Sequence, residues 1–147
     1  MKKILSIVLA LLLVVLMALP AAARSNAISE ARKGVVRILA FEDNSRSYGT
    51  GSGVAVGQAG KPTSVFVTNN HVIAGADNIY ILLDNQWEDS VPAFGGKEDG
   101  LHAVRCEVVS TPGSAPDYAI LKSSREISER LAQPLMHAQN AAPGETI

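Results

Sequence analysis

Short apolar segments separated by turn sequences constrain the fold of this 147-residue chain more than any other feature. Several of them alternate apolar and polar side chains, and clusters of Gly, Pro, Asn, Asp and Ser separate them. The predicted strands are 35–41, 48–56, 63–68, 79–83, 103–109 and 118–122. Apart from a short helix expected within 25–33, a helical period is nearly absent. Six short strands separated by turn sequences predict an all-β fold, a closed antiparallel six-stranded barrel.

The first 23 residues have the pattern of a signal peptide. Lys2 and Lys3 precede an uncharged apolar run, 4–19, and the small residues Ala21–Ala23 follow it. The run is shorter than the roughly 20 residues that a membrane-spanning helix needs. We therefore expect cleavage after Ala23 and export to the cell envelope or beyond it. The alternative is an uncleaved N-terminal anchor, which would be the only contact with a membrane.

The charge of the remaining domain, 24–147, argues against a nucleic-acid partner. The 13 Lys and Arg, two of them in the leader, are outnumbered by 14 Asp and Glu and form no cluster. Cys106 is the only cysteine, so an internal disulfide is excluded and packing must hold the fold. Because Cys106 alternates with Val104 and Val108, we interpret it as a small buried apolar residue rather than a reactive thiol.

Other candidate sites have simpler structural interpretations. Gly49, Gly51 and Gly53 do not form a phosphate-binding loop, because a strand-like sequence follows, and we expect a bent glycine-rich strand. His102 and His137 lack metal-ligand spacing and acidic partners, and we expect them at the surface. The sequence thus predicts no metal site and no cofactor.

The segment 84–100 fits the strand pattern less well. It is rich in acidic residues, Gly, Asn and Gln, and it holds the only tryptophan, Trp87. We interpret it as a long hairpin or surface loop. Four of its acidic residues are expected to be solvated, with a calcium site as a remote alternative; they are Glu88, Asp89, Glu98 and Asp99.

A histidine and an aspartate lie at the ends of two predicted strands. The apolar run 65–67 leads through Thr68 to His71, and Asp117 opens the apolar segment 118–122. An imidazole with a pKa near 6.5 can act as general base for a serine hydroxyl when a carboxylate fixes its tautomer and orientation. Either residue alone is better interpreted as an ordinary turn residue. Their joint occurrence at strand ends, after a glycine-rich strand, favours a catalytic pair.

Three stretches, in this order, resemble the first half of a trypsin-like serine peptidase, most closely the bacterial HtrA-like branch: Gly49-Thr50-Gly51-Ser52-Gly53-Val54, Val67-Thr68-Asn69-Asn70-His71-Val72 and Asp117-Tyr118-Ala119-Ile120-Leu121-Lys122. The resemblance covers residues 34–122 well. It implies a chymotrypsin-like fold of two antiparallel Greek-key barrels with the active site between them. It also implies that His71 is the general base and Asp117 its orienting acid. On this basis we expect 34–124 to form the first barrel and 125–147 to begin the second. The family usually has a shorter connection where this chain has its 84–100 segment.

The resemblance further implies a serine nucleophile in a Gly-x-Ser-Gly-Gly setting after the aspartate, and an oxyanion hole in the second barrel. Ser123, Ser124 and Ser128 follow the aspartate without flanking glycines, and Ser52 precedes the histidine. We therefore expect the nucleophile outside these 147 residues. The expected function is a secreted serine endopeptidase that acts on protein or peptide substrates without a cofactor. The 147 residues alone are expected to be inactive.

A function of a different class stays open at this point. A degenerate, non-catalytic peptidase barrel could act as a binding module of the cell envelope, because a fold does not imply an activity. The coding sequence after Ile147 discriminates the two, since only the enzyme requires a serine flanked by glycines. Neither cleavage specificity nor oligomeric state follows from the sequence.

Overall fold

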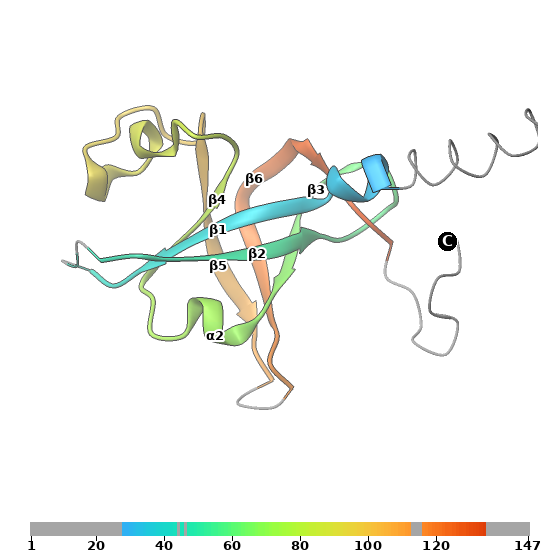
Figure 1. The fold of residues 1–147 in the computed structure, drawn as a ribbon, viewed down its shortest axis with the longest axis horizontal. Coiled ribbons are helices and arrows are strands. Elements are labelled where there is room, and N and C mark those ends of the chain that lie inside the picture. Colours follow the sequence, from blue (N-terminus) through green and yellow to red (C-terminus); the bar gives the residue numbers. More distant parts are fainter. Residues whose placement is uncertain (1–27, 44, 46, 113–115, 135–147) are drawn as a thin grey trace, which may run out of the picture. The chain divides into compact units, whose positions relative to one another are not determined.

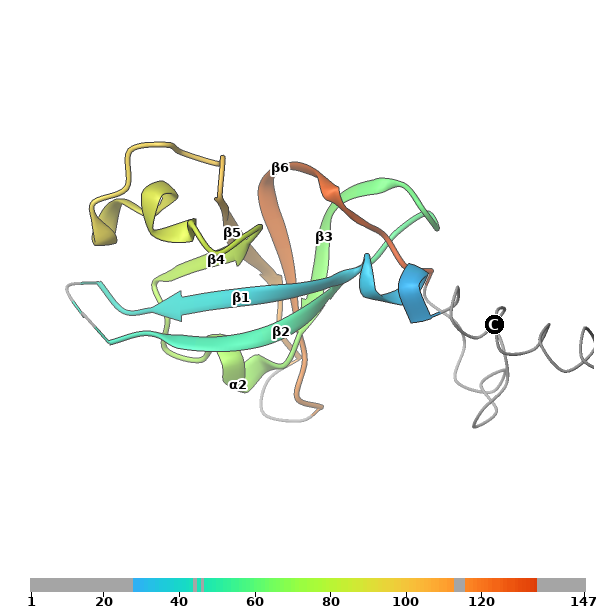
Figure 2. The ribbon, with the colours of Figure 1, turned by 45° about the horizontal axis from the view of Figure 1, so that its top comes forward.

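Six antiparallel strands close into a barrel in the computed structural model, which describes residues 28–43, 45, 47–112 and 116–134. The strands are β1 (Val35–Phe41), β2 (Gly49–Ala55), β3 (Pro62–Thr68), β4 (Asn78–Leu82), β5 (Ala103–Ser110) and β6 (Ala119–Leu131). Their order around the barrel is β1-β2-β3-β6-β5-β4, and pairing of β1 with β4 completes the circle (Figures 1 and 2). The structure therefore confirms the predicted all-β barrel. The predicted leader, His137 and the end of the chain from residue 135 lie outside the described residues.

The barrel strands belong to one compact unit, Lys33–Met136. Of the helix expected within 25–33, residues 28–33 are described; 28–32 are helical and Lys33 lies in a turn. In the part of the chain that the structure describes, no helix is both long and apolar enough to cross a bilayer.

Strand β6 is longer than the sequence predicted. We expected a strand over 118–122, a helical turn within 123–133 and the start of a second barrel at 125. Instead β6 continues to Leu131 and pairs with β3, where Thr63 lies opposite Ile127. Ser123 faces the interior, where its hydroxyl donates to the carbonyl of Arg125 over 2.6 Å. Pairing with β3 thus keeps this polar sequence extended, and residues 125–131 belong to the first barrel.

The interior of the barrel is an apolar core to which every strand contributes. Alternate residues of each strand point inward, as the two-residue period of a strand requires. The buried members are Val36, Ile38, Ala40, Ala55, Phe66, Ile73, Ile79, Ile81, Val104, Cys106, Ala119, Leu121 and Ile127. Cys106 is buried among them, as predicted.

A second core lies on the outer side of β1 and β4. It contains Leu39 and Phe41 from β1 and Tyr80 and Leu82 from β4, which point away from the interior. This explains why both strands are apolar at consecutive positions rather than at alternate ones. A surface strand that is apolar on both faces needs a cover, and another part of the chain supplies it.

The segment 84–100 is this cover. It connects β4 to β5 and most of its residues are exposed, as expected of a surface loop, but it also buries Trp87, Ser90 and Val91, which the sequence did not predict. It forms two 3-10 turns, η1 (Trp87–Ser90) and η2 (Pro92–Phe94), which follow β4 (Figure 2). Trp87 and Val91 are buried against the outer side of β1 and β4. The side chains of Glu88, Asp89, Glu98 and Asp99 are nevertheless exposed, as expected. Burial of a tryptophan removes about 150–250 Å² of its surface from water, which gives this long connection a defined conformation.

Candidate active site

Pairing of β3 with β6 brings the predicted site residues together. Thr68, the last residue of β3, lies opposite Ala119, the first residue of β6. The chain leaves β3 through a one-turn helix, α2 (Asn70–Ile73), which carries His71. Asp117 lies two residues before β6. Figures 1 and 2 show α2 at the same end of the barrel as the start of β6.

His71 and Asp117 share two hydrogen bonds. The ring Nδ1 of His71 lies 2.5 Å from Oδ2 of Asp117. The backbone N–H of His71 donates to the other carboxylate oxygen, Oδ1, over 2.9 Å. The side-chain amide of Asn69 donates to the backbone carbonyl of Asp117 over 3.1 Å and to Oδ2 over 3.4 Å. Asn69 was part of the quoted motif, but sequence reasoning did not assign it this role. Both carboxylate oxygens are thereby held in place.

The hydrogen bonds have an electrostatic consequence for Asp117. The bond from the ring of His71, followed by the bond from its backbone N–H, lowers the pKa of the Asp117 carboxyl below its ordinary value. The carboxylate is therefore ionised at neutral pH and can only accept hydrogen bonds. This places the proton of a neutral His71 ring on Nδ1 and leaves Nε2 as the acceptor.

The pair is accessible from outside the barrel. The His71 side chain is 72% exposed and that of Asp117 is 43% exposed. Among the described residues, every hydrogen bond of His71 goes to Asp117. Nε2 is therefore open to a group that approaches from solution or from another segment.

Glycine in β2 makes room for the helix that carries His71. A Cβ atom on Gly51 would lie 2.4 Å from Cγ1 and 2.7 Å from Cγ2 of Val72, the residue after the histidine. Such distances are well inside van der Waals contact. The end of β3 is fixed as well, because the buried hydroxyl of Thr68 donates to the carbonyl of Ser52 over 2.8 Å. The glycine-rich strand thus has a packing role next to the site.

A hollow of about 370 Å³ adjoins His71. Its described walls come from the end of β1, from described residues of the connection to β2, and from α2 with the turn after it. The described residues that line it include Glu42, Tyr48, Val72 and Gly75. Sequence reasoning did not identify this hollow, since its parts are separated along the chain.

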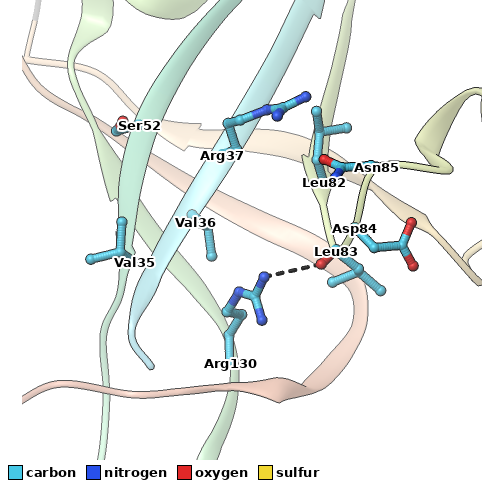
Figure 3. A pocket seen from close by; sticks show the side chains of 9 residues that line it. All are labelled: Val35, Val36, Arg37, Ser52, Leu82, Leu83, Asp84, Asn85 and Arg130. Carbon is cyan, nitrogen blue, oxygen red and sulfur yellow. Dashed lines mark hydrogen bonds between the residues drawn. The ribbon is translucent and has the colours of Figure 1, made fainter. Parts of the chain in front are cut away.

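A second hollow, of about 380 Å³, lies at the opposite end of β1 and contains neither His71 nor Asp117. Figure 3 shows Arg37 and Arg130 among the residues that line it. Arg130 donates to the backbone carbonyl of Leu83 over 3.0 Å and to that of Glu129 over 2.9 Å. Its guanidinium therefore ties β6 to the end of β4. Ser52 also lines this hollow, away from the histidine.

The prediction that His102 lacks acidic partners was wrong. Its Nδ1 lies 2.8 Å from Oδ2 of Asp84, and its Nε2 lies 3.3 Å from Oε2 of Glu98. The His102 side chain is only 15% exposed. The hydrogen bond with Asp84 is the main cause that raises the pKa of His102 above its ordinary value. The partners come from segment 84–100, so the folded segment creates this pair. Within the described ranges, no group of three or more His, Cys, Asp or Glu side chains is arranged to hold a metal ion.

Comparison with solved structures shows that the barrel is similar in fold to part of HtrA-type proteases. The HtrA-type protease AlgW with tripeptide matches 79% of this chain with 25% identity and a TM-score of 0.51. A second AlgW structure with tripeptide matches 80% with 24% identity and a TM-score of 0.52. The active form of the Rv3671c protease from M. tuberculosis matches 84% with 22% identity and a TM-score of 0.52. No family model and no curated protein sequence matches the chain.

The match covers only part of each protease. The aligned region spans 30% and 31% of the two AlgW chains and 43% of the Rv3671c chain. The structure is thus a chymotrypsin-like barrel similar to the one in HtrA-type proteases, as the sequence resemblance implied.

Proposed function

We propose that this barrel contributes the general base and the orienting acid to a secreted serine endopeptidase of trypsin-like fold. One observation carries the proposal: the Nδ1 of His71 is bonded to the ionised Asp117, 2.5 Å away, while Nε2 faces outward without a partner among the described residues. This is the arrangement in which an imidazole accepts a proton from a serine hydroxyl. The likeness of the fold to HtrA-type proteases supports it.

Each residue has a defined role in the proposed reaction. His71 Nε2 takes the proton of the serine as its oxygen attacks the carbonyl carbon of the peptide bond. His71 then gives this proton to the leaving amine. Asp117 keeps the imidazole in the Nδ1–H tautomer and stabilises the imidazolium that forms. The side-chain amide of Asn69 helps to hold Asp117 by donating to its backbone carbonyl and to Oδ2.

The nucleophile and the oxyanion donors belong, in this proposal, to sequence outside the 147 residues. Of the three serines after Asp117, Ser123 is buried and bonded within β6, and Ser128 bonds Glu129. Loss of a serine nucleophile lowers turnover by roughly 10⁶, and loss of an oxyanion donor by about 10²–10³. The chain alone should therefore be inactive.

The proposed substrates are proteins or peptides. Two structures of AlgW, to which this barrel is similar, contain a tripeptide. The open position of Nε2 and the hollow beside His71 agree with a chain-like substrate that passes over the surface.

Export is part of the proposal and rests on the leader, 1–23. The N-terminal sequence of the secreted protein should start at Arg24 or within one or two residues of it. Recovery of the intact leader in the membrane fraction would instead indicate an uncleaved anchor.

Labelling with a fluorophosphonate probe tests the enzymatic proposal. The secreted protein should react if its coding sequence continues beyond Ile147 into a Gly-Asp/Asn-Ser-Gly-Gly stretch, whereas the 147-residue chain should not. His71→Ala should strongly weaken labelling. His102→Gln, at the other histidine with a carboxylate partner, is the matched control and should keep it.

Two outcomes would contradict the proposal. Efficient labelling of the 147-residue chain would show that the nucleophile lies within it. A stop codon directly after Ile147, with no labelling of any form, would favour the non-catalytic binding module.

A further inference from the structure

The described wall of the hollow beside His71 carries one acidic side chain, that of Glu42. Among its described lining residues, Glu42 is the only carboxylate and there is no Lys or Arg. The Glu42 carboxylate reaches over the turn after α2, since its Oε1 lies 3.8 Å from the position of a Cβ built on Gly75. Gly75 has a φ of 79° and lines the same hollow. The negative charge is thus next to the open space.

Within the described ranges, the Glu42 side chain differs from the acidic side chains around it, which make hydrogen bonds that hold turns together. Asp43 accepts a hydrogen bond from the side chain of Asn78 over 2.6 Å. Asp77 accepts one from the backbone N–H of Asp43 over 2.9 Å. These two carboxylates hold the turns together. Within the described part of the chain, the exposed carboxylate of Glu42 has no hydrogen-bond or ion-pair partner, so it can receive a cation from a ligand.

Tyr48 provides an aromatic wall to the same hollow. Its ring packs edge-on against Trp87, with centroids 5.5 Å apart, and against Phe94, with centroids 5.6 Å apart. Segment 84–100 thereby holds Tyr48 in place, while 47% of the residue stays exposed. A fixed aromatic ring in the same hollow as a carboxylate suits the long alkyl stem and the cationic end of a Lys or Arg side chain.

We propose that this hollow is a substrate subsite that takes a basic side chain, Lys or Arg, of a peptide whose scissile bond lies at His71. The inference rests on the proposed peptidase function and names its substrate class. Glu42 is the specificity-determining residue, because it supplies the only charge on the described wall. Tyr48 packs along the aliphatic part of the side chain.

Ligand binding tests the subsite without any need for catalysis. The ¹⁵N-labelled protein is titrated with Nα-acetyl-lysine amide, and with the norleucine and glutamate analogues, while amide NMR shifts are followed. The lysine ligand should shift the amides of Glu42, Tyr48 and His71. It should bind up to roughly fivefold more tightly than the neutral norleucine ligand, the range of an exposed ion pair. The preference should decrease with added salt.

Charge variants at Glu42 make the test specific. Glu42→Gln should abolish the preference for lysine over norleucine, and Glu42→Asp should keep part of it. Glu107→Gln, on β5 and outside the hollow, removes the same charge and should leave the preference intact. Since the Glu42 side chain has no partner among the described residues, circular dichroism should show that these variants fold normally. Equal binding of the three ligands, or a preference unaffected by Glu42→Gln, would overturn the inference.

Peptide cleavage by the secreted protein separates the inference from the function on which it rests. Peptides carry lysine, norleucine or glutamate in turn at each position around the cut. At one position the kcat/KM for lysine should exceed that for norleucine several-fold, and Glu42→Gln should bring the ratio to about one. Cleavage without any such Glu42-dependent position would refute the subsite. Absence of all cleavage, with Glu42-dependent lysine binding preserved, would refute the peptidase function and leave the basic-ligand site standing.

Discussion

Thr68 and Ala119 are direct partners in the ladder between β3 and β6, and this pairing determines where the histidine and the aspartate lie. His71 follows Thr68 by three residues, and Asp117 precedes Ala119 by two. Two side chains separated by 46 residues therefore meet at one end of the barrel, with ring Nδ1 and carboxylate Oδ2 2.5 Å apart.

Asp117→Asn tests the orienting role of this carboxylate. An amide at this position can donate to Nδ1, which favours the wrong tautomer of His71. In the active secreted protein we expect kcat to fall by roughly 10⁴, with little change in the thermal unfolding temperature. Asp84→Asn disrupts the other histidine–carboxylate pair and should leave kcat nearly unchanged. Similar losses of kcat in both variants would indicate a general effect on folding instead.

Gly51→Ala tests the close packing of β2 against α2. The new Cβ would overlap the side chain of Val72, so we expect a loss of about 1–3 kcal/mol in the free energy of unfolding. Combination with Val72→Ala should restore part of this loss, because it removes the two methyl groups in conflict. Gly49→Ala is the matched control, since its nearest neighbour is the carbonyl of Ala40 at 3.8 Å. If Gly49→Ala and Gly51→Ala lower the free energy of unfolding by the same amount, close packing of β2 against α2 is not the cause of the loss.

The pair of His102 and Asp84 predicts a pH-dependent stability. Hydrogen bonding to Asp84, with a further contribution from Glu98, raises the pKa of His102 in the folded protein. The folded state then binds the proton more tightly than the unfolded state. The resulting stabilisation is complete below the ordinary histidine pKa near 6.5 and is lost as pH rises through the folded value.

Urea unfolding between pH 5.5 and 8.5 measures this contribution. The wild-type protein should lose stability with rising pH relative to His102→Gln, whose glutamine does not titrate. Asp84 has the opposite dependence, because its lowered pKa stabilises the folded state above the unfolded value and this is lost at acidic pH. A constant difference between wild type and His102→Gln over the whole range would contradict the assignment.

Cys106 should be chemically inert in the folded protein. Burial raises the pKa of its thiol to about 12, so the reactive thiolate is almost absent at neutral pH. Iodoacetamide should modify Cys106 at pH 8 only after addition of denaturant. Cys106→Ala/Val109→Cys carries its thiol on an exposed position of β5, where the native residue is 59% exposed, and should react without denaturant. Rapid modification of native Cys106 would show that the barrel opens readily.

The sequence predicted those features that depend on neighbouring residues. Short apolar runs bounded by turn residues located β1 and β3 within one or two residues. Alternation of apolar and polar side chains located β5 equally well, because a two-residue period reflects the geometry of a single strand. The same alternation predicted that Cys106 is buried. The order of the glycine-rich strand, His71 and Asp117 along the chain predicted the chymotrypsin-like barrel and named His71 and Asp117 as the candidate pair.

Only the tertiary structure decided the remaining features, because they depend on contacts between residues far apart in the chain. β6 extends to Leu131 since β3 supplies a partner for its polar half, which by itself favoured a helical turn. Segment 84–100 is ordered because β1 and β4 present an outer apolar face to Trp87 and Val91. The same packing gives His102 its two carboxylates and brings Tyr48 to the hollow beside His71. A local pattern encodes the conformation of a segment, whereas burial, partner and charge environment are properties of the folded barrel as a whole.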